Sequence, residues 1–464
     1  MSPRRLTADA RVRTVRSARN WVTRASYWQQ WLALGVTIGL AAGLCAVAFF
    51  EVLALTTHVL TGILGGYKAP APASDGDGQG TGHFPHTWAI PVIACLGGLA
   101  SGALITWLAP EATGRGIEAT IEAAHNDPRK IRGRSMVAEF AASAITIGSG
   151  GSGGRGGAAA QLSAGFGSLL ARTLDLTAED GRTALCVGIG SGFGAIFGAP
   201  LGGAVLAAEI VYKDDFEARA LFPGLIASVT SYTIFGVVEG FTPLFGYAGA
   251  GYRFGRPVEL AWFAVVGVLG GLLGLIYGTT FQGVMAVAER IPGSRVVKPA
   301  VGGLLVGLLA LVIPQVMGTG YGWIQNALDG AQLLRIPLWI ILAMPLAKIA
   351  ATALSVGTGG SGGLAGPGLV TGAFAGAAVW RVLELFASGV PHNPAPFVII
   401  GMMSCFGSIA RTPIAMMFIV AEMTGSTLIL APAMVAVGIA YLIVNSSGQT
   451  IYRSQVRARD RARC

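Results

Sequence analysis

Residues 148–172, GSGGSGGRGGAAAQLSAGFGSLLAR, place a glycine-rich loop directly before a helix. Glycine lets backbone N–H groups approach a ligand with no Cβ in the way. The first N–H groups of a helix have no intrahelical partner, and the helix macrodipole adds positive charge at that end. The stretch therefore favours the binding of an anion at the helix N-terminus.

The chain contains a second copy of this stretch at residues 357–376, GTGGSGGLAGPGLVTGAFAG, offset by 209 residues. Two other stretches repeat in the same order: PEATGRG (110–116) matches PQVMGTG (314–320), and residues 188–209 match residues 401–422. Collinear matches with similar offsets indicate an internal duplication. We predict a first membrane repeat at 31–245 and a second at 246–464, which ends in a basic C-terminal helix.

The composition is that of an integral membrane protein. Of 464 residues, 53% are hydrophobic and 12% are charged, whereas an ordinary soluble domain has about 25% charged residues. The apolar stretches are long and do not alternate, which predicts an all-α protein rather than a barrel. Between residues 117 and 237 the apolar pieces are short and cut by glycine or proline. Paired broken helices of this kind indicate a binding site near the membrane midplane.

The net charge of +9 is concentrated at the two ends of the chain. The first 25 residues hold seven arginines against one aspartate, and the last 13 hold five against one. This distribution argues against nucleic acid binding. By the positive-inside rule it predicts a multi-pass protein of the cell inner (plasma) membrane with both termini cytoplasmic. Residues 1–30 are expected to form a basic amphipathic helix that contacts anionic lipid.

The sequence offers no metal site, cofactor site or catalytic motif. The five cysteines are scattered without a CxxC spacing, which is typical of small buried side chains. Glu118, Glu122 and His125 share a helix face, but no fourth ligand is evident, so a water-facing stripe is the preferred interpretation. HExxH, GxSxG and paired-aspartate motifs do not occur. An intramembrane enzyme is therefore not expected.

With these motifs in order, nearly the whole chain resembles the CLC family of chloride channels and anion/proton exchangers. The family signatures GSGIP, GREGP and GGxFxP correspond to GRGIE (114–118), GRGGA (154–158) and GGLAGP (362–367), and the family's closing tyrosine to Tyr452. The resemblance implies a CLC-type inverted repeat of many short, broken and tilted helices. It also implies a homodimer with one anion pathway in each subunit, in contact through 201–212, 217–237, 414–424 and 428–446. The CBS domains of some relatives have no counterpart here.

The same resemblance implies which residues bind the anion. Backbone amides near Arg155, Gly156 and Gly157 would form an outer site. Those of Leu364 and Ala365, with the hydroxyl of Tyr452, would form a central one. Arg115 and Gly116 belong to the first signature and complete the set.

Three departures from the family pattern change the expected mechanism. The family's gating glutamate is Gly156 here, and the inner proton glutamate falls on Ile210. Glu209 is one position away and could replace it only in a shifted helix, while its match to Glu422 favours a structural role. The pore-lining serine is replaced by Arg115.

We therefore predict passive transport of chloride-type anions that is not coupled to protons. Two alternatives stay open. Arg115 could select another anion, such as bicarbonate or nitrate, or the chain could be a coupled secondary transporter of an organic anion.

Overall fold

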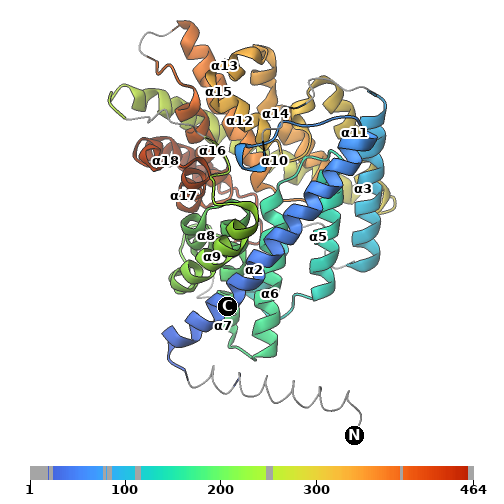
Figure 1. Cartoon of the computed structure of the whole chain (residues 1–464), viewed down its shortest axis with the longest axis vertical. Helices are drawn as coiled ribbons and strands as arrows, with labels where there is room; N and C mark the ends of the chain where they lie inside the picture. The colour runs from blue at the N-terminus through green and yellow to red at the C-terminus, as the bar shows by residue number, and fades with distance from the viewer. Residues whose placement is uncertain are drawn as a thin grey trace.

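The computed structural model describes residues 19, 25–76, 80, 86–109, 116–246, 254–386 and 390–457. Arg115, most of the predicted N-terminal helix 1–30 and residues 458–464 lie outside the described residues. All the regular elements in the described part are helices (Figure 1). Seven of them are long and apolar enough to cross a membrane: 27–64 (one continuous span), 89–108, 218–239, 259–290, 338–356, 365–386 and 427–447.

The helices of the first half run in the order that the sequence predicts. The first span is α2 (Tyr27–Thr57), which continues as the π-helix η1 (His58–Leu64) and is followed by the 3-10 turn η2 (Ala73–Asp75). Further helices are α3 (Ala89–Leu108), α4 (Ile117–Asn126), α5 (Gly133–Gly148), α6 (Arg155–Thr173), α7 (Ala178–Ile196), α8 (Pro200–Glu209) and α9 (Ala218–Glu239).

The second half repeats this series. Its helices are α10 (Glu259–Arg290), α11 (Val297–Val312), α12 (Tyr321–Leu328), α14 (Leu338–Val356), α15 (Ala365–Phe386), α16 (Ala395–Ile409), α17 (Pro413–Thr424) and α18 (Leu430–Ser447). Three short elements are added to this series: the 3-10 turns η3 (Pro314–Val316) and η4 (Thr427–Ile429), and the short helix α13 (Gly330–Arg335) between α12 and α14. Equivalent helices pack in equivalent pairs: α2 contacts α9 as α10 contacts α18, and α6 contacts α7 as α15 contacts α16.

The two halves have opposite orientations, as equivalent helices of the two halves show where they meet. The carboxylate of Glu209, at the end of α8, accepts N–H bonds from Ile414 (3.3 Å) and Ala415 (2.8 Å) at the start of α17. In return, Glu422 of α17 accepts N–H bonds from Leu201 (3.1 Å) and Gly202 (2.8 Å) at the start of α8. Such reciprocal bonds require the two helices to run antiparallel about a local two-fold axis. The inverted repeat is thereby confirmed.

Helices α6 and α7 are each 19 residues long, longer than the pieces expected from the sequence. Glycines within α7 allow these two helices to pack closely. A Cβ at Gly188 would lie 2.5 Å from the Cα of Ala164, and one at Gly192 would lie 2.7 Å from the Cα of Ala160. The predicted breaks between the helices of this region are present, and only the helix ends differ from the prediction by a few residues.

The helix predicted from about residue 449 is absent from residues 449–457, which are irregular. Gly448 ends α18 in the left-handed conformation, with φ of 67°. The backbone beyond it bonds to other parts of the chain: Ile451 N–H donates to Ile409 O (2.9 Å), and Lys213 N–H donates to Val456 O (3.1 Å). Tertiary hydrogen bonds replace the helical ones in this segment.

Candidate anion-binding site

The two glycine-serine loops cross inside the protein. Gly154 N–H donates to Gly363 O (2.7 Å), and Gly363 N–H donates to Gly154 O (3.0 Å). Hydroxyl groups repeat the same symmetry: Ser143 bonds to Ser361 and Ser152 bonds to Thr352, both at 2.8 Å. The crossing needs glycine, because a Cβ at Gly157 would lie 2.4 Å from the Cα of Gly363.

A cavity of about 390 Å³ lies beside this crossing. The second loop lines it through residues 357–359 and 361–363. Residues at the N-termini of three helices also line it: Gly116 and Ile117 of α4, Gly157 and Ala158 of α6, and Leu364, which precedes α15. Neither α4 nor α6 has a side chain that caps its first N–H groups. Uncapped helix N-termini that meet at one cavity are suited to hold an anion.

Four of the residues implicated by sequence line this one cavity: Gly116, Gly157, Leu364 and Tyr452. Ala365 is buried next to Leu364 at the start of α15. Charged side chains also reach the cavity, namely Glu118, Glu289, Arg295 and Lys298. Glu118 is 8% exposed, whereas Glu122 on the same helix face is exposed, and both line a second pocket together with His125. In the described residues no group of histidine, cysteine, aspartate or glutamate side chains is arranged to hold a metal.

Arg155 and Gly156 lie against a different environment, an aromatic cap formed by Phe193, Phe197, Phe245 and Tyr321. The ring centroids of Phe193 and Phe197 are 5.4 Å apart, and that of Tyr321 is 6.2 Å from Phe197 and 6.1 Å from Phe245. A Cβ at Gly156 would lie 2.5 Å from Cε2 of Phe197. The aromatic cap therefore covers Gly156, which the sequence resemblance aligns with the gating glutamate of the CLC family.

The side chain of Arg155 is buried, with 4% of its surface exposed. Its guanidinium forms an ion pair with Asp75 of η2 (3.0 Å) and stacks on the rings of Tyr321 and Phe50, with centroids at 5.2 and 5.3 Å. Such stacking of a guanidinium is favourable. Arg155 thus holds the aromatic cap and the loop after η1 together.

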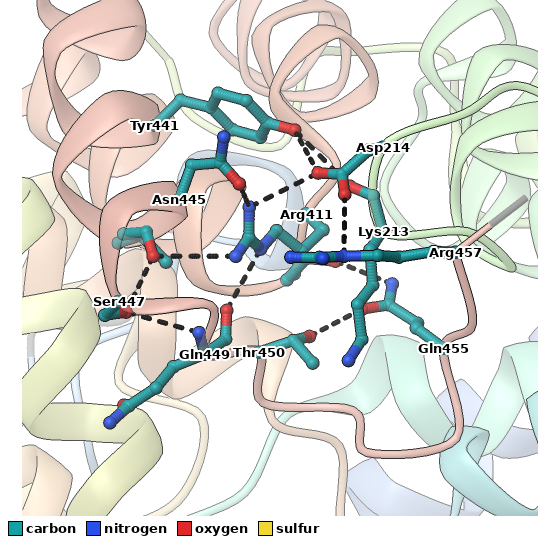
Figure 2. A network of polar contacts seen from close by, with 12 residues as sticks. Lys213, Asp214, Arg411, Tyr441, Asn445, Ser447, Gln449, Thr450, Gln455 and Arg457 are labelled. Carbon is teal, nitrogen blue, oxygen red and sulfur yellow. Dashed lines mark hydrogen bonds and ion pairs between the residues drawn. The ribbon is translucent and has the colours of Figure 1, made fainter. Parts of the chain in front are cut away.

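The segment that carries Tyr452 is attached to the ends of two helices through Gln455, whose side chain also meets Thr450 (Figure 2). The Gln455 amide donates to the carbonyl oxygens of Ile210 (2.8 Å) and Ala410 (2.9 Å), and its Oε1 accepts from the hydroxyl of Thr450. Buried carbonyl groups at helix ends need such partners. Ile210 therefore contributes its backbone to the support of Tyr452, although its side chain cannot carry a proton.

Arg411 forms the second anchor of this segment (Figure 2). Its backbone is left-handed, with φ of 58°, and its buried guanidinium donates to Gln449 O (3.0 Å) and to Asn445 Oδ1. Asp214 lies 3.6 Å away and the Tyr441 ring centroid 5.6 Å away. We did not assign Arg411 from sequence. The available signal was a lone arginine between two apolar helices.

Tyr277 of α10 is a further residue that sequence did not indicate. It is fully buried, and its hydroxyl donates to Leu364 O at 2.9 Å. This bond fixes the carbonyl that precedes α15 and so orients the N–H groups after it. A single tyrosine in a long apolar span gives no sequence signal for this role.

Comparison with known proteins identifies the family to which the chain belongs. The model of the voltage gated chloride channel family matches residues 97–445, most of the chain. The chain belongs to the CLC family. A protein of Ralstonia nicotianae named "Putative chloride channel protein ClcB-like" is 28% identical over 93% of this chain and 97% of its own length.

Solved CLC structures share the fold. A slow cyanobacterial Cl⁻/H⁺ antiporter has a TM-score of 0.76 at 19% identity and covers 91% of this chain and 96% of its own. A CLC-type fluoride/proton antiporter has a TM-score of 0.74 at 22% identity and covers 94% of this chain and 100% of its own. As a CLC protein, the chain is a membrane protein of an anion-transporting family.

Proposed function

We propose that this protein conducts chloride-type anions passively across the cell inner membrane, with both termini in the cytoplasm. The observation that carries the proposal is the meeting of three helix N-termini at one cavity, with Tyr452 in its wall. Oriented N–H groups attract a negative ion without any permanent charge. By their place in the family motifs, Leu364, Ala365 and Tyr452 would form the central anion site and the amides near Gly157 the outer one.

The absence of proton coupling follows from two positions. Gly156 has no side chain to titrate, and the aromatic cap covers it. Ile210 is apolar, and the neighbouring Glu209 is engaged by two N–H groups of α17, as expected for the structural role suggested by its match to Glu422. The antiporter structures are under 25% identical to this chain. Their similarity supports the fold without extending their coupling to this protein.

Chloride efflux from proteoliposomes tests the proposed transport. We expect efflux well above that of protein-free liposomes when valinomycin and potassium balance the charge. Loading parallel samples with nitrate or bicarbonate measures anion preference in the same assay. Efflux at the protein-free level for all three anions would contradict the proposal.

We propose further that two copies associate through residues 201–212, 217–237, 414–424 and 428–446. Exposed apolar side chains gather on these segments, among them Leu225, Val229, Ile414 and Leu442. We expect native mass spectrometry in detergent to give the mass of two chains, and the double variant Val229→Arg/Ile414→Arg to give one. The control Leu342→Arg, on exposed apolar surface of α14, should stay dimeric. A single-chain mass for the unmodified protein would contradict this proposal.

A further inference from the structure

A buried carboxyl group lies behind the wall of the anion cavity. Glu139, in α5, is 2% exposed, and its Oε2 has no hydrogen-bond partner in the described structure. One turn further along α5, Ser143 lines the cavity. Residues four apart share a helix face, so Glu139 is on the face of α5 that is turned toward the cavity. Burying an unpaired charge is costly, which suits this group to exchange a proton.

Gln161 of α6 connects Glu139 with the cavity. Its side-chain amide interacts with the Glu139 carboxyl, and the same side chain lines the cavity. The Oε1 atom lies 3.9 Å from the place that a Cβ at Gly116 would take, so Gln161 reaches the N-terminus of α4. A glutamine amide has one donor end and one acceptor end. The end bound by Glu139 therefore decides which end faces the cavity.

The charge state of Glu139 sets the orientation of this amide. An ionised carboxylate only accepts hydrogen bonds, so it holds the NH₂ of Gln161 and leaves the amide oxygen for the cavity. A protonated carboxyl can donate to that oxygen, which frees the NH₂ to face the cavity. The first state presents a negative charge and an acceptor to an anion, whereas the second presents a donor.

Few charged side chains lie on the helices that pack against Glu139. Helix α3, which packs on α5, carries no aspartate, glutamate, lysine, arginine or histidine. The other packed elements contribute Glu51 of α2, His58 of η1, and Arg155 and Arg172 of α6, while Arg134 shares α5 itself. Arg155 is paired with Asp75 and Arg134 with the carbonyl of Trp107. Across the cavity stand Glu118, Glu289, Arg295 and Lys298.

The inverted repeat gives an internal comparison. The counterpart of Glu139, 209 residues later, is Lys348. Lys348 is fully buried, and its ammonium donates to Val316 O (2.8 Å) and Gly318 O (3.0 Å), which holds the loop before α12. A carboxylate cannot make those bonds, because it has no proton to donate. Glu139 therefore does not repeat the structural role of its counterpart.

We propose that Glu139 and Gln161 form a proton-controlled anion-binding element of the cavity. With Glu139 neutral, the Gln161 amide donates to a small anion such as chloride. With Glu139 ionised, the amide oxygen and the carboxylate charge disfavour the anion. The proton alters the rate of transport and is not itself carried across. This inference rests on the proposed anion transport. For the same cavity it names chloride as the ligand and protonation of Glu139 as the regulation.

Chloride efflux at equal pH on both sides of the membrane, from about pH 8 to about pH 5, tests the element over the range in which a buried carboxyl titrates. We expect efflux of the unmodified protein to rise about tenfold as the pH falls, the change that removal of a unit charge near an ion can produce. Glu139→Gln should be fast at every pH. The control Glu122→Gln, an exposed acid on α4 outside this cavity, should keep the rise.

Gln161→Leu provides a second, independent variant, because it removes the donor and leaves the charge. We expect its half-saturating chloride concentration to rise roughly tenfold at low pH, the loss of one hydrogen bond to a charged ligand. At high pH we expect no rise, because the variant then loses only an amide oxygen that disfavours the anion. Glu139→Gln with the pH profile of the unmodified protein, or an equal Gln161→Leu effect at both pH values, would overturn the inference.

Calorimetric titration of the detergent-solubilised protein with chloride separates the two proposals. The element predicts tighter chloride binding at low pH that Glu139→Gln makes independent of pH. This result without efflux would remove the proposed transport and keep the element. Efflux with pH-independent chloride binding would keep the proposed transport and remove the proton-controlled element.

Discussion

Gly157→Val is expected to abolish anion transport. Its Cβ would lie 2.4 Å from the Cα of Gly363, well inside the separation of about 3.5–4 Å at which carbon atoms make favourable contact. The obstacle is backbone, so no side chain can move away, and the two crossed loops must separate. A displacement of roughly 1 Å at a positioned site can cost about a hundredfold in rate. We expect chloride efflux to fall by at least that factor.

Gly283→Val is the matched control for this substitution. Gly283 lies in α10 with no atom within 4 Å of the place its Cβ would take, so efflux should stay near that of the unmodified protein. Gel filtration shows whether each variant is folded and of normal size. A folded Gly157→Val protein with unreduced efflux would show that the loop crossing does not hold the permeant anion.

Gly156→Glu is expected to create a pH-dependent block. The added Cβ would lie 2.5 Å from Cε2 and 2.7 Å from Cζ of Phe197. These are the far atoms of a side chain, so the ring can turn aside. The new carboxylate then reaches the uncapped N–H groups of α6 and competes with the permeant anion. We expect efflux to drop roughly thirtyfold at neutral pH, as for a unit charge in a partly desolvated site.

The sign of the pH effect follows from the charge of the new side chain. Acidification neutralises the carboxyl group, which removes the competing charge, so efflux recovers as the pH falls. Gly156→Gln has nearly the same size and no charge, and its efflux should be reduced by the same factor at every pH. Equal pH profiles for the glutamate and glutamine variants would place the outer site elsewhere.

Sequence predicted the parts of the fold that depend on repeated patterns. The matched glycine-serine loops, the Glu209/Glu422 pair and the order of the helices all recur in the structure. Each is a local pattern whose physical requirement is visible in the residues themselves. The loops need glycine for backbone contact, and the two glutamates supply acceptors at helix N-termini.

Other features depend on contacts between distant segments and left no local pattern. The aromatic cap joins Phe193 and Phe197 with Tyr321, more than 120 residues away. The support of Tyr452 requires Gln455 to meet the ends of α8 and α16. A basic segment after an apolar helix is typical of a cytoplasmic helix, so sequence favoured a helix at 449–457. The tertiary hydrogen bonds that replace it became visible only in the folded chain.

Protons can act on a transporter in two ways, by controlling its rate or by being carried across. Glu139 is placed where we propose that its charge controls access of an anion. Gly156 and Ile210, which the resemblance aligns with the family's two proton glutamates, have no titratable side chain. On this proposal, the protein responds to pH without using a proton gradient as a source of energy. The distinction is measurable, because control changes the rate while coupling moves protons in proportion to chloride.

Simultaneous measurement of chloride and proton movement tests the central claim most directly. Proteoliposomes loaded with chloride are placed in low-chloride medium, and a chloride electrode and a pH electrode record both fluxes after valinomycin is added. We predict rapid chloride efflux while proton movement stays at the level of protein-free liposomes. Proton uptake in fixed proportion to chloride efflux, continuing against a proton gradient, would contradict the account.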